Sequence, residues 1–234
     1  MKVIERDTDR KAEVHIYVEG QVDALEEYGE YIDAKDSAIC CYVPVQENHN
    51  VRIGGKFSGT TMSIAYDAIV DGVLRKASSY TAKSVGVQKN KKLDFESFLD
   101  KACGAVVDTA MFVSPIAGAV IARGEGKETI GAIELRLYIT RQLGVTHLPG
   151  RVDNYDENTG NIGNEKNRCA TYKLIAPTFQ MAFEKSSETL DKARVAREHR
   201  KMNSTRPGSE PWAIFRFYYR NKGKKSPQLY RMRR

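Results

Sequence analysis

The chain has 234 residues and a formal net charge of +7, a length that allows one domain with long loops or a domain with an appendage. Hydrophobic residues make up 41% of it, with twelve Tyr and eight Phe, which argues against wholesale disorder. Six bases and no acid lie in the tail 221–234, so residues 1–220 carry a net charge of only +1. The basic character therefore belongs to the tail.

The cysteines and the N-terminal residues indicate the cellular compartment in which we expect the protein. Cys40, Cys41, Cys103 and Cys169 show no C-x-x-C spacing and no paired His pattern, which predicts reduced thiols and no zinc site. The first residues, MKVIERDTDRK, lack the apolar segment of a secretory signal. We therefore expect an intracellular protein, cytoplasmic or nuclear.

One apolar stretch, residues 102–122, has the length of a membrane span. Asp108 lies inside it and Ser114-Pro115 interrupts its middle. Because a charge in the bilayer is costly, a loop leading into a buried strand explains the stretch better, and no membrane association is expected.

Alternating apolar and polar residues recur in the first half of the chain and predict β-strands. In EVHIYVEG, Val14, Ile16 and Val18 share one face. Further candidate strands are SAICCYVPV (37–45), NVRIGGKF (50–57), TMSIAY (61–66) and DAIVDGVLRKA (67–77). The last of these carries Asp71-Gly72 between two apolar runs, which predicts a type I′ hairpin turn. KKLDFESFL (91–99) fits a strand or a helix.

The second half continues with the strand IELRLYITR (133–141) and then a polar, Asn- and Gly-rich stretch, predicted to be a long exposed loop over residues 145–169. A charged helix is predicted over about 178–202. No βαβ rhythm appears. The pattern therefore predicts a mainly β fold: a single antiparallel β-sandwich-like domain over residues 1–220, with one charged C-terminal helix and a flexible basic tail at 221–234.

The last predicted strand, PWAIFRFYYR (211–220), has two different faces. Ala213, Phe215, Phe217 and Tyr219 form a core face. The opposite face mixes aromatic and basic side chains, which are Trp212, Ile214, Arg216, Tyr218 and Arg220. Such a face is typical of single-strand-binding surfaces. It equally fits an edge strand, or a strand covered by the preceding helix, where Arg stems pack over aromatic rings.

A search for catalytic and metal-binding motifs gives no candidate. The chain contains no H-E-x-x-H, G-x-S-x-G or Walker-type motif. The stretch 153–165 offers oxygen ligands but does not fit the EF-hand spacing, because the twelfth position counted from Asp156 is Asn167. We therefore expect no enzyme, no catalytic residue, no cofactor and no metal site.

Several short motifs occur together in one order. They are V-x-G-Q from Val18, C-Y-V-P from Cys41, V-D-G-x-x-x-R from Val70, G-x-I-E-x-R-x-Y from Gly131 and P-x-A-I-F-x-F-x-Y-R from Pro211. In this series the chain resembles an uncharacterised, predominantly fungal domain family of unknown function. The resemblance covers roughly residues 12–220 and implies a β-rich, sandwich-like domain without a signal peptide. The chain departs from the family pattern after Arg220, where the basic tail begins.

These observations favour a non-enzymatic binding or assembly module that acts through protein–protein contacts, with a protein partner or a second copy of the chain. The alternative is a nucleic-acid-associated protein, and a third reading is a structural subunit of a larger particle. The candidate partner or nucleic-acid surface comprises Trp212, Arg216, Tyr218, Arg220, Lys222, Lys224, Lys225, Arg231, Arg233 and Arg234.

Overall fold

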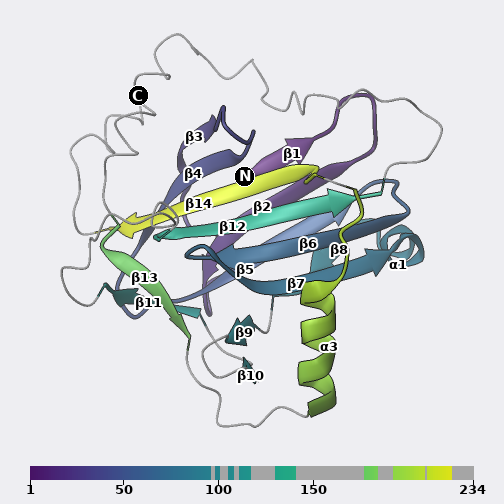
Figure 1. Cartoon of the computed structure of the whole chain (residues 1–234). Coiled ribbons are helices and arrows are strands. Elements are labelled where there is room, and N and C mark those ends of the chain that lie inside the picture. The colour runs from purple at the N-terminus through teal and green to yellow at the C-terminus, as the bar shows by residue number, and fades with distance from the viewer. Residues whose placement is uncertain are drawn as a thin grey trace.

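The computed structural model of the chain is mainly β, as the alternation predicts (Figure 1). It describes residues 1–95, 98–100, 105–107, 111–116, 130–140, 177–183, 192–208 and 210–222. The predicted loop 145–169, Cys103 and Cys169, and the tail beyond residue 222 lie outside these ranges. The described strands form two large sheets and a two-stranded ribbon of β9 (Phe98–Asp100) and β10 (Ala105–Val107).

The first sheet, sheet A, has the order β1-β2-β5-β11-β13, and β8 pairs with β5 beside that path. Its long members are β2 (Lys11–Val18) and β5 (Asn50–Ser58), which pair antiparallel along eight residues. The shorter members are β1 (Lys2–Ile4), β8 (Lys91–Leu93), β11 (Met111–Pro115) and β13 (Phe179–Phe183). The ambiguous segment 91–99 thus contributes strand residues at both of its ends.

The second sheet, sheet B, has the order β3-β4-β14-β12-β6-β7. Its members are β3 (Tyr28–Ile32), β4 (Ile39–Val45), β6 (Ser63–Val70), β7 (Val73–Thr81), β12 (Ala132–Ile139) and β14 (Ala213–Asn221). The β4–β14 ladder is parallel, and its neighbours in the sheet are antiparallel. In Figure 1, β14 and β12 lie in front of β2 and β5.

The core lies between the two sheets, where the alternating apolar residues predicted from the sequence meet. Val14, Ile16 and Val18 are buried on β2, and Ala213, Phe215, Phe217 and Tyr219 are buried on β14. Burial of these faces removes apolar surface from water and is the main contribution that holds the sheets together.

The Asp71-Gly72 turn joins β6 to β7 as predicted, with Val70 opposite Val73 and φ of 50° and 75° at the two central residues. The Asp71 side chain does more than make the turn. Its carboxylate accepts hydrogen bonds from the Gly131 and Met181 main-chain N–H groups at 2.8 Å and from the Tyr219 hydroxyl at 2.6 Å. Since Met181 lies on β13 of sheet A, this carboxylate links the hairpin of sheet B to the other sheet.

The predicted helix over 178–202 is wrong in its first part. Residues Phe179–Phe183 form strand β13, which pairs with β11 and buries Phe179 and Met181. Their alternation in FQMAF is a strand pattern, and pairing with β11 prevails over the charged pattern that follows. The part of the predicted helix that the structure describes as helical is α3 (Lys192–Asn203), which packs against β7. A second helix, α1 (Ala82–Val87), follows β7.

Candidate functional site

Trp212 does not belong to the surface on which the alternation placed it. It precedes β14, is only 3% exposed, and packs edge-on against Phe57 of sheet A at a ring distance of 5.7 Å. The alternation fails because the strand begins at Ala213, so the backbone before it need not point Trp212 outward. A buried ring cannot stack on a nucleic-acid base, and this correction removes the largest aromatic group from the proposed platform.

Arg216 points outward from β14 but is surrounded by acids. Its Nε donates to Glu134 at 2.7 Å, its guanidinium binds Asp36, and Asp33 lies 3.8 Å away. These carboxylates outweigh burial and raise the pKa of Arg216 above its usual value. Its charge is already neutralised within the fold, so Arg216 contributes little to phosphate attraction.

Arg220 and Tyr218 form a packed cluster on the same outer face. The Tyr218 ring stacks on Tyr42 at 5.4 Å, and the Arg220 guanidinium lies 5.7 Å from the Tyr218 centroid and 5.8 Å from that of Tyr42. Arg220 also donates to the Gly131 and Tyr219 carbonyls at 2.9 and 2.7 Å. The packing of Arg over aromatic rings was expected for a strand covered by the preceding helix, but α3 packs against β7 rather than β14. The edge-strand interpretation is wrong, because β14 lies between β4 and β12.

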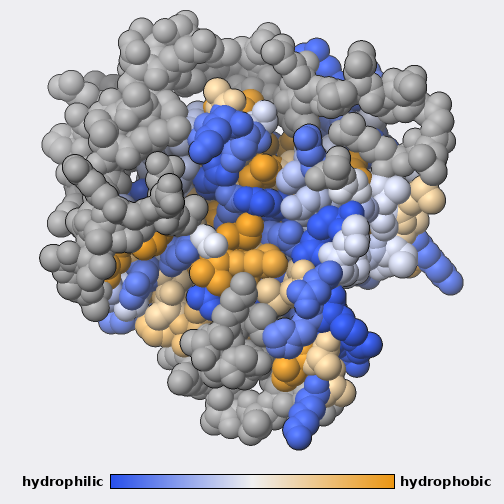
Figure 2. Space-filling view, viewed as in Figure 1, coloured by the Kyte–Doolittle hydropathy of each residue, from blue (hydrophilic) through white to orange (hydrophobic). Residues whose placement is uncertain are grey.

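The described side chains on the outer face of β12 and β14 form no single apolar patch (Figure 2). Figure 2 shows hydrophilic and hydrophobic side chains interspersed there, with part of the face under grey atoms. Lys222 is exposed at the end of the ladder with β4. Lys224, Lys225, Arg231, Arg233 and Arg234 lie outside the described residues.

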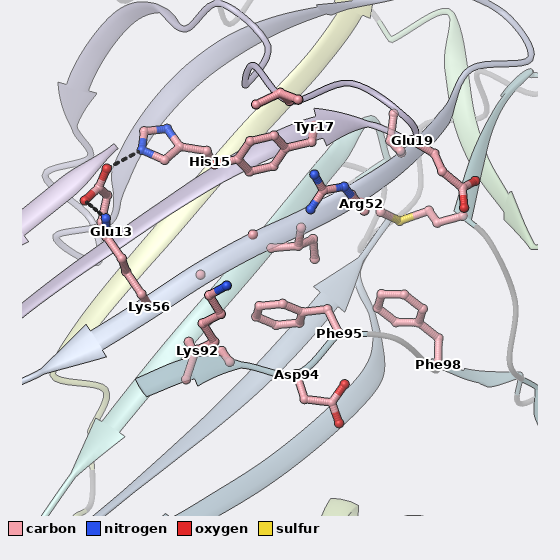
Figure 3. A pocket seen from close by; sticks show the side chains of 17 residues that line it. Glu13, His15, Tyr17, Glu19, Arg52, Lys56, Lys92, Asp94, Phe95 and Phe98 are labelled. Carbon is pink, nitrogen blue, oxygen red and sulfur yellow. Dashed lines mark hydrogen bonds and ion pairs between the residues drawn. The ribbon is translucent and has the colours of Figure 1, made fainter. Parts of the chain in front are cut away.

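The strongest candidate site is on the other sheet and was not predicted. A cavity of about 900 Å³ lies over β2, β5 and β8. We call it the sheet-A groove; its lining residues are Glu13, His15, Tyr17, Glu19, Val22, Val51, Arg52, Ile53, Gly54, Gly55, Lys56, Lys92, Leu93, Asp94, Phe95, Phe98 and Met111 (Figure 3). The odd-numbered residues of β2 line it because the even-numbered ones face the core.

One end of the groove is a chain of ion pairs. Glu13 binds Lys56 at 2.8 Å and His15 Nε2 at 3.0 Å, and His15 Nδ1 binds Glu27 at 2.8 Å. Lys56 and His15 lower the pKa of Glu13 to about 2, and Glu27 raises the pKa of His15. With a carboxylate at each ring nitrogen, the imidazolium form is favoured and neither nitrogen is free to act as a base.

The floor of the groove is the Gly54-Gly55 pair of β5. The Tyr17 ring lies on Gly54 so closely that an added Cβ would be 2.4 Å from its Cε2 atom, and a Cβ on Gly55 would be 3.2 Å from Phe95. The Arg52 guanidinium lies 4.5 Å from the Tyr17 centroid. Glycine in a strand interior marks a place where another group approaches the backbone closely, and here aromatic rings do so.

β5 has two further partners on the side away from β2. Val51 pairs with Met111 of β11, and Gly55 pairs with Leu93 of β8. Residues 108–110, which precede Met111, lie outside the described ranges. The buried side chains of Met111 and Phe98 also line the groove.

The hydrogen-bonding pattern along β5 shows which of its main-chain groups point away from β2. Glu19 N–H donates to the Asn50 carbonyl at 2.8 Å, so Glu19 and Asn50 are a hydrogen-bonded pair. Pairs alternate in an antiparallel ladder, so the odd-numbered residues of β5 point their main-chain groups away from β2. The N–H and C=O of Ile53 thus point toward the side of β5 on which β8 and β11 pair with it.

Some charged side chains around the groove have a partner of opposite charge among the described residues, and others do not. Asp94 pairs with Lys76 at 3.5 Å, and Glu19 accepts from Asn50 at 3.1 Å. Arg52 donates to the Gln21 carbonyl at 3.3 Å, and neither Arg52 nor Lys92 has a carboxylate partner within the described ranges. In Figure 3 the Arg52 guanidinium lies beside the Tyr17 ring, and Lys92 lies on the neighbouring strand near Phe95. The two cations make this part of the groove suited to an anionic group.

The described residues give no support to catalytic or metal chemistry at the other positions considered. Burial raises the pKa of Cys40 to about 11 and that of Cys41 further, so neither thiol is activated. No group of three or more His, Cys, Asp or Glu in this part of the chain is placed to hold a metal ion.

The sequence contained one signal of the groove, the Gly-Gly pair inside NVRIGGKF. The groove itself depends on how β2, β5 and β8 come together, which alternation does not reveal. No helix among the residues described is long and apolar enough to cross a membrane. Comparisons of the chain with protein-family models, with curated proteins and with solved structures find no match, so the resemblance to the fungal family stays a prediction.

Proposed function

We propose that the protein is a non-enzymatic binding module that takes a short extended segment of a protein partner into the sheet-A groove. The observation that carries this proposal is the sheet-A groove itself, a cavity of about 900 Å³ whose lining combines aromatic rings with the exposed cations Arg52 and Lys92. Binding pockets typically combine such an apolar and aromatic lining with a few charged groups that fix the orientation of the ligand.

In peptide recognition, pockets for alternate side chains of an extended segment give specificity. The groove supplies the rings of Tyr17, Phe95 and Phe98 in its lining for such contacts. Its volume of about 900 Å³ is enough for a few residues rather than for a whole folded surface.

The proposal can be tested with random heptapeptide libraries displayed on phage, one with free C-termini and one with internal peptides. Peptides enriched on the full chain are synthesised, and their binding is measured by fluorescence anisotropy. Amide chemical shifts are then compared by NMR with and without saturating peptide. We expect the changes to be confined to residues that line the groove, such as Tyr17, Arg52 and Lys92. Enrichment no better than on blank beads, or a bound peptide that leaves the shifts of the lining residues unchanged, would contradict the proposal.

A nucleic-acid role is the second candidate, and the exposed Lys222 and the acid-free composition of 221–234 favour it. Within the described residues, Arg216 and Arg220 are engaged by neighbours and Trp212 is buried, so the tail would have to provide the binding. A role as a particle subunit would use self-association, which light scattering of the purified chain measures.

A further inference from the structure

The outward face of helix α3 is basic. The helix contains five bases and one acid, Glu198, which is buried and binds Lys201 at 2.6 Å. Lys192, Arg197 and Arg200 are exposed, and none of these three cations has a hydrogen bond or an ion pair with a described residue. We call these three residues the basic face of α3. Their positive charge is not compensated within the described part of the chain.

Helical spacing and one arginine fix the direction in which this face points. Val195, Glu198 and Met202, at i, i+3 and i+7, are the residues of α3 that are buried or half-buried on its inner side, and the helix contacts β7. Arg206 holds the end of the helix, because it binds Asp67 of β6 at 2.7 Å and donates to the Met202 carbonyl at 3.2 Å. In Figure 1 the helix extends away from the two sheets. The basic face is therefore presented outward in a fixed orientation.

The opposite edge of sheet B carries the opposite charge. Residues 23–36, which include the edge strand β3 and which we call the acidic segment, contain six acids and one base. Glu27, Asp33 and Asp36 have cationic partners, but a single guanidinium serves the last two. Asp23 is exposed and has no cationic partner among the described residues. The acidic segment therefore keeps a net negative charge in the folded chain.

The two charged surfaces cannot meet within one molecule. The order β3-β4-β14-β12-β6-β7 places β3 at one edge of sheet B and β7, on which α3 packs, at the other. Five strand spacings, or about 24 Å, separate these edges. Opposite charges at that separation attract each other weakly within one copy, whereas the basic face of one copy and the acidic segment of another can come into contact.

We propose that the chain associates with itself head to tail, so that the basic face of α3 in one copy binds the acidic segment of a second copy. Ala193 and Ala196 lie exposed among the cations and are small enough to let the partner approach closely. Ile32, which is 44% exposed, supplies apolar area on the acidic segment.

The contact joins two different surfaces, so each added copy leaves one basic face and one acidic segment available. Such a heterologous contact builds rings or open chains rather than a two-fold dimer. In the assembled state the acids of the second copy cover the cations of α3, which leaves the attraction of polyanions to the tail.

The test is sedimentation velocity of the full chain over a range of protein concentrations. At low salt we expect the weight-average sedimentation coefficient to rise with concentration. The rise should be lost in about 1 M salt, where the Debye length is about 3 Å. The double variants Arg197→Glu/Arg200→Glu and Asp23→Lys/Glu26→Lys should each stay monomeric at low salt. All four positions are exposed, so the thermal unfolding midpoint should be nearly unchanged.

An equimolar mixture of the two double variants tests the head-to-tail arrangement itself. One variant has two acidic surfaces and the other has two basic surfaces, so neither associates alone but each provides what the other lacks. The mixture should therefore associate at low salt as the unmodified chain does. Arg6→Glu/Lys11→Glu is the matched control, because it reverses two exposed bases that lie outside both surfaces. It should associate like the unmodified chain.

A chain that stays monomeric at low salt overturns the inference, and so does a mixture that does not associate. Association that survives the reversal in α3 also overturns it. If that association is then lost when the chain ends at Lys222, the basic tail rather than α3 binds the acidic segment. None of these outcomes bears on the sheet-A groove, whose lining shares no residue with the basic face or the acidic segment.

Discussion

The Asp71 carboxylate is the residue-scale feature that ties the turn of one sheet to a strand of the other. Burial raises its pKa above the usual Asp value, although three donors favour the charged form. The left-handed backbone at this position suits Asp better than most residues, since its short side chain tolerates positive φ. Its identity is therefore set by turn geometry and by the three donors together.

Replacing Asp71 by Ala should lower the free energy of unfolding by about 3 kcal/mol, because the Gly131 and Met181 amides and the Tyr219 hydroxyl lose their acceptor. Urea unfolding measures the change. Asp7→Ala is the control, since Asp7 also has positive φ (56°) but is exposed, and it should cost no more than about 1 kcal/mol. Equal losses in the two variants would show that backbone conformation, not the buried acceptor, sets the stability.

His15 gives a prediction about pH. The Glu27 carboxylate is the main cause that raises the pKa of His15 above 6.5, so the folded protein binds this proton more tightly than the unfolded chain does. That stabilisation is complete below about pH 6.5 and is lost as the pH rises through the raised value. Urea unfolding measures the change. The free energy of unfolding of the unmodified chain should be up to about 1 kcal/mol lower at pH 8 than at pH 6.

His15→Gln should remove most of that difference between the two pH values. His199→Gln, which changes an exposed histidine on α3, should leave the difference as it is. An unchanged pH dependence in His15→Gln would mean that another group titrates.

At the scale of elements, the sequence predicted most strands well and the helix only in part. β2 and β14 show clear alternation, because each has one face on the core. β4, β6 and β12 were also predicted but are buried on both faces, and β1 and β3 were not predicted. β13 was hidden by the charged run that follows it, and its strand state depends on β11, a partner about 70 residues away in sequence. Such long-range pairing is not encoded in local periodicity.

The candidate site was predictable only in fragments. The alternation identified Arg216, Tyr218 and Arg220 as one face but could not show that Glu134 and Asp36, from distant segments, neutralise Arg216. The sheet-A groove is lined by residues of β2, β5 and β8 that come together only in the folded chain. The Gly54-Gly55 pair was the only local sequence feature that indicated the groove.

The start of β12 offers a test of element packing. Gly131 has φ of 79°, and a Cβ there would be 2.6 Å from Pro177 and 2.8 Å from the Arg220 guanidinium. Gly131→Ala should therefore lower the free energy of unfolding by about 2–4 kcal/mol. Gly86→Ala in α1, where a Cβ meets nothing within 4 Å, should be neutral or stabilising by up to about 1 kcal/mol. Similar effects of both changes would contradict the packing at Gly131.

At the scale of the whole molecule, the excess positive charge belongs to the tail and not to residues 1–220. The body is close to neutral, and its outward bases on β14 are bound to neighbours, whereas the tail has no acid to balance it. Polyanion attraction should therefore come from the tail alone.

A chain ending at Lys222 should elute from heparin at much lower salt than the intact chain, because it lacks five bases of the tail. Arg216→Gln in the intact chain should leave the elution salt unchanged, since that guanidinium is already neutralised. Retention that survives the truncation would place a nucleic-acid surface on the body and reopen the second candidate function.

The position of β14 has a consequence for how the protein is made. This strand lies between β4 and β12 in sheet B, yet it is the last described strand to be synthesised. Until residue 221 has left the ribosome, β4 and β12 each present an unpaired edge and the core lacks Phe215, Phe217 and Tyr219. Sheet B can therefore be completed only after β14 has been synthesised. A nascent chain that is halted earlier would expose the unpaired edges of β4 and β12 to chaperones or to other chains.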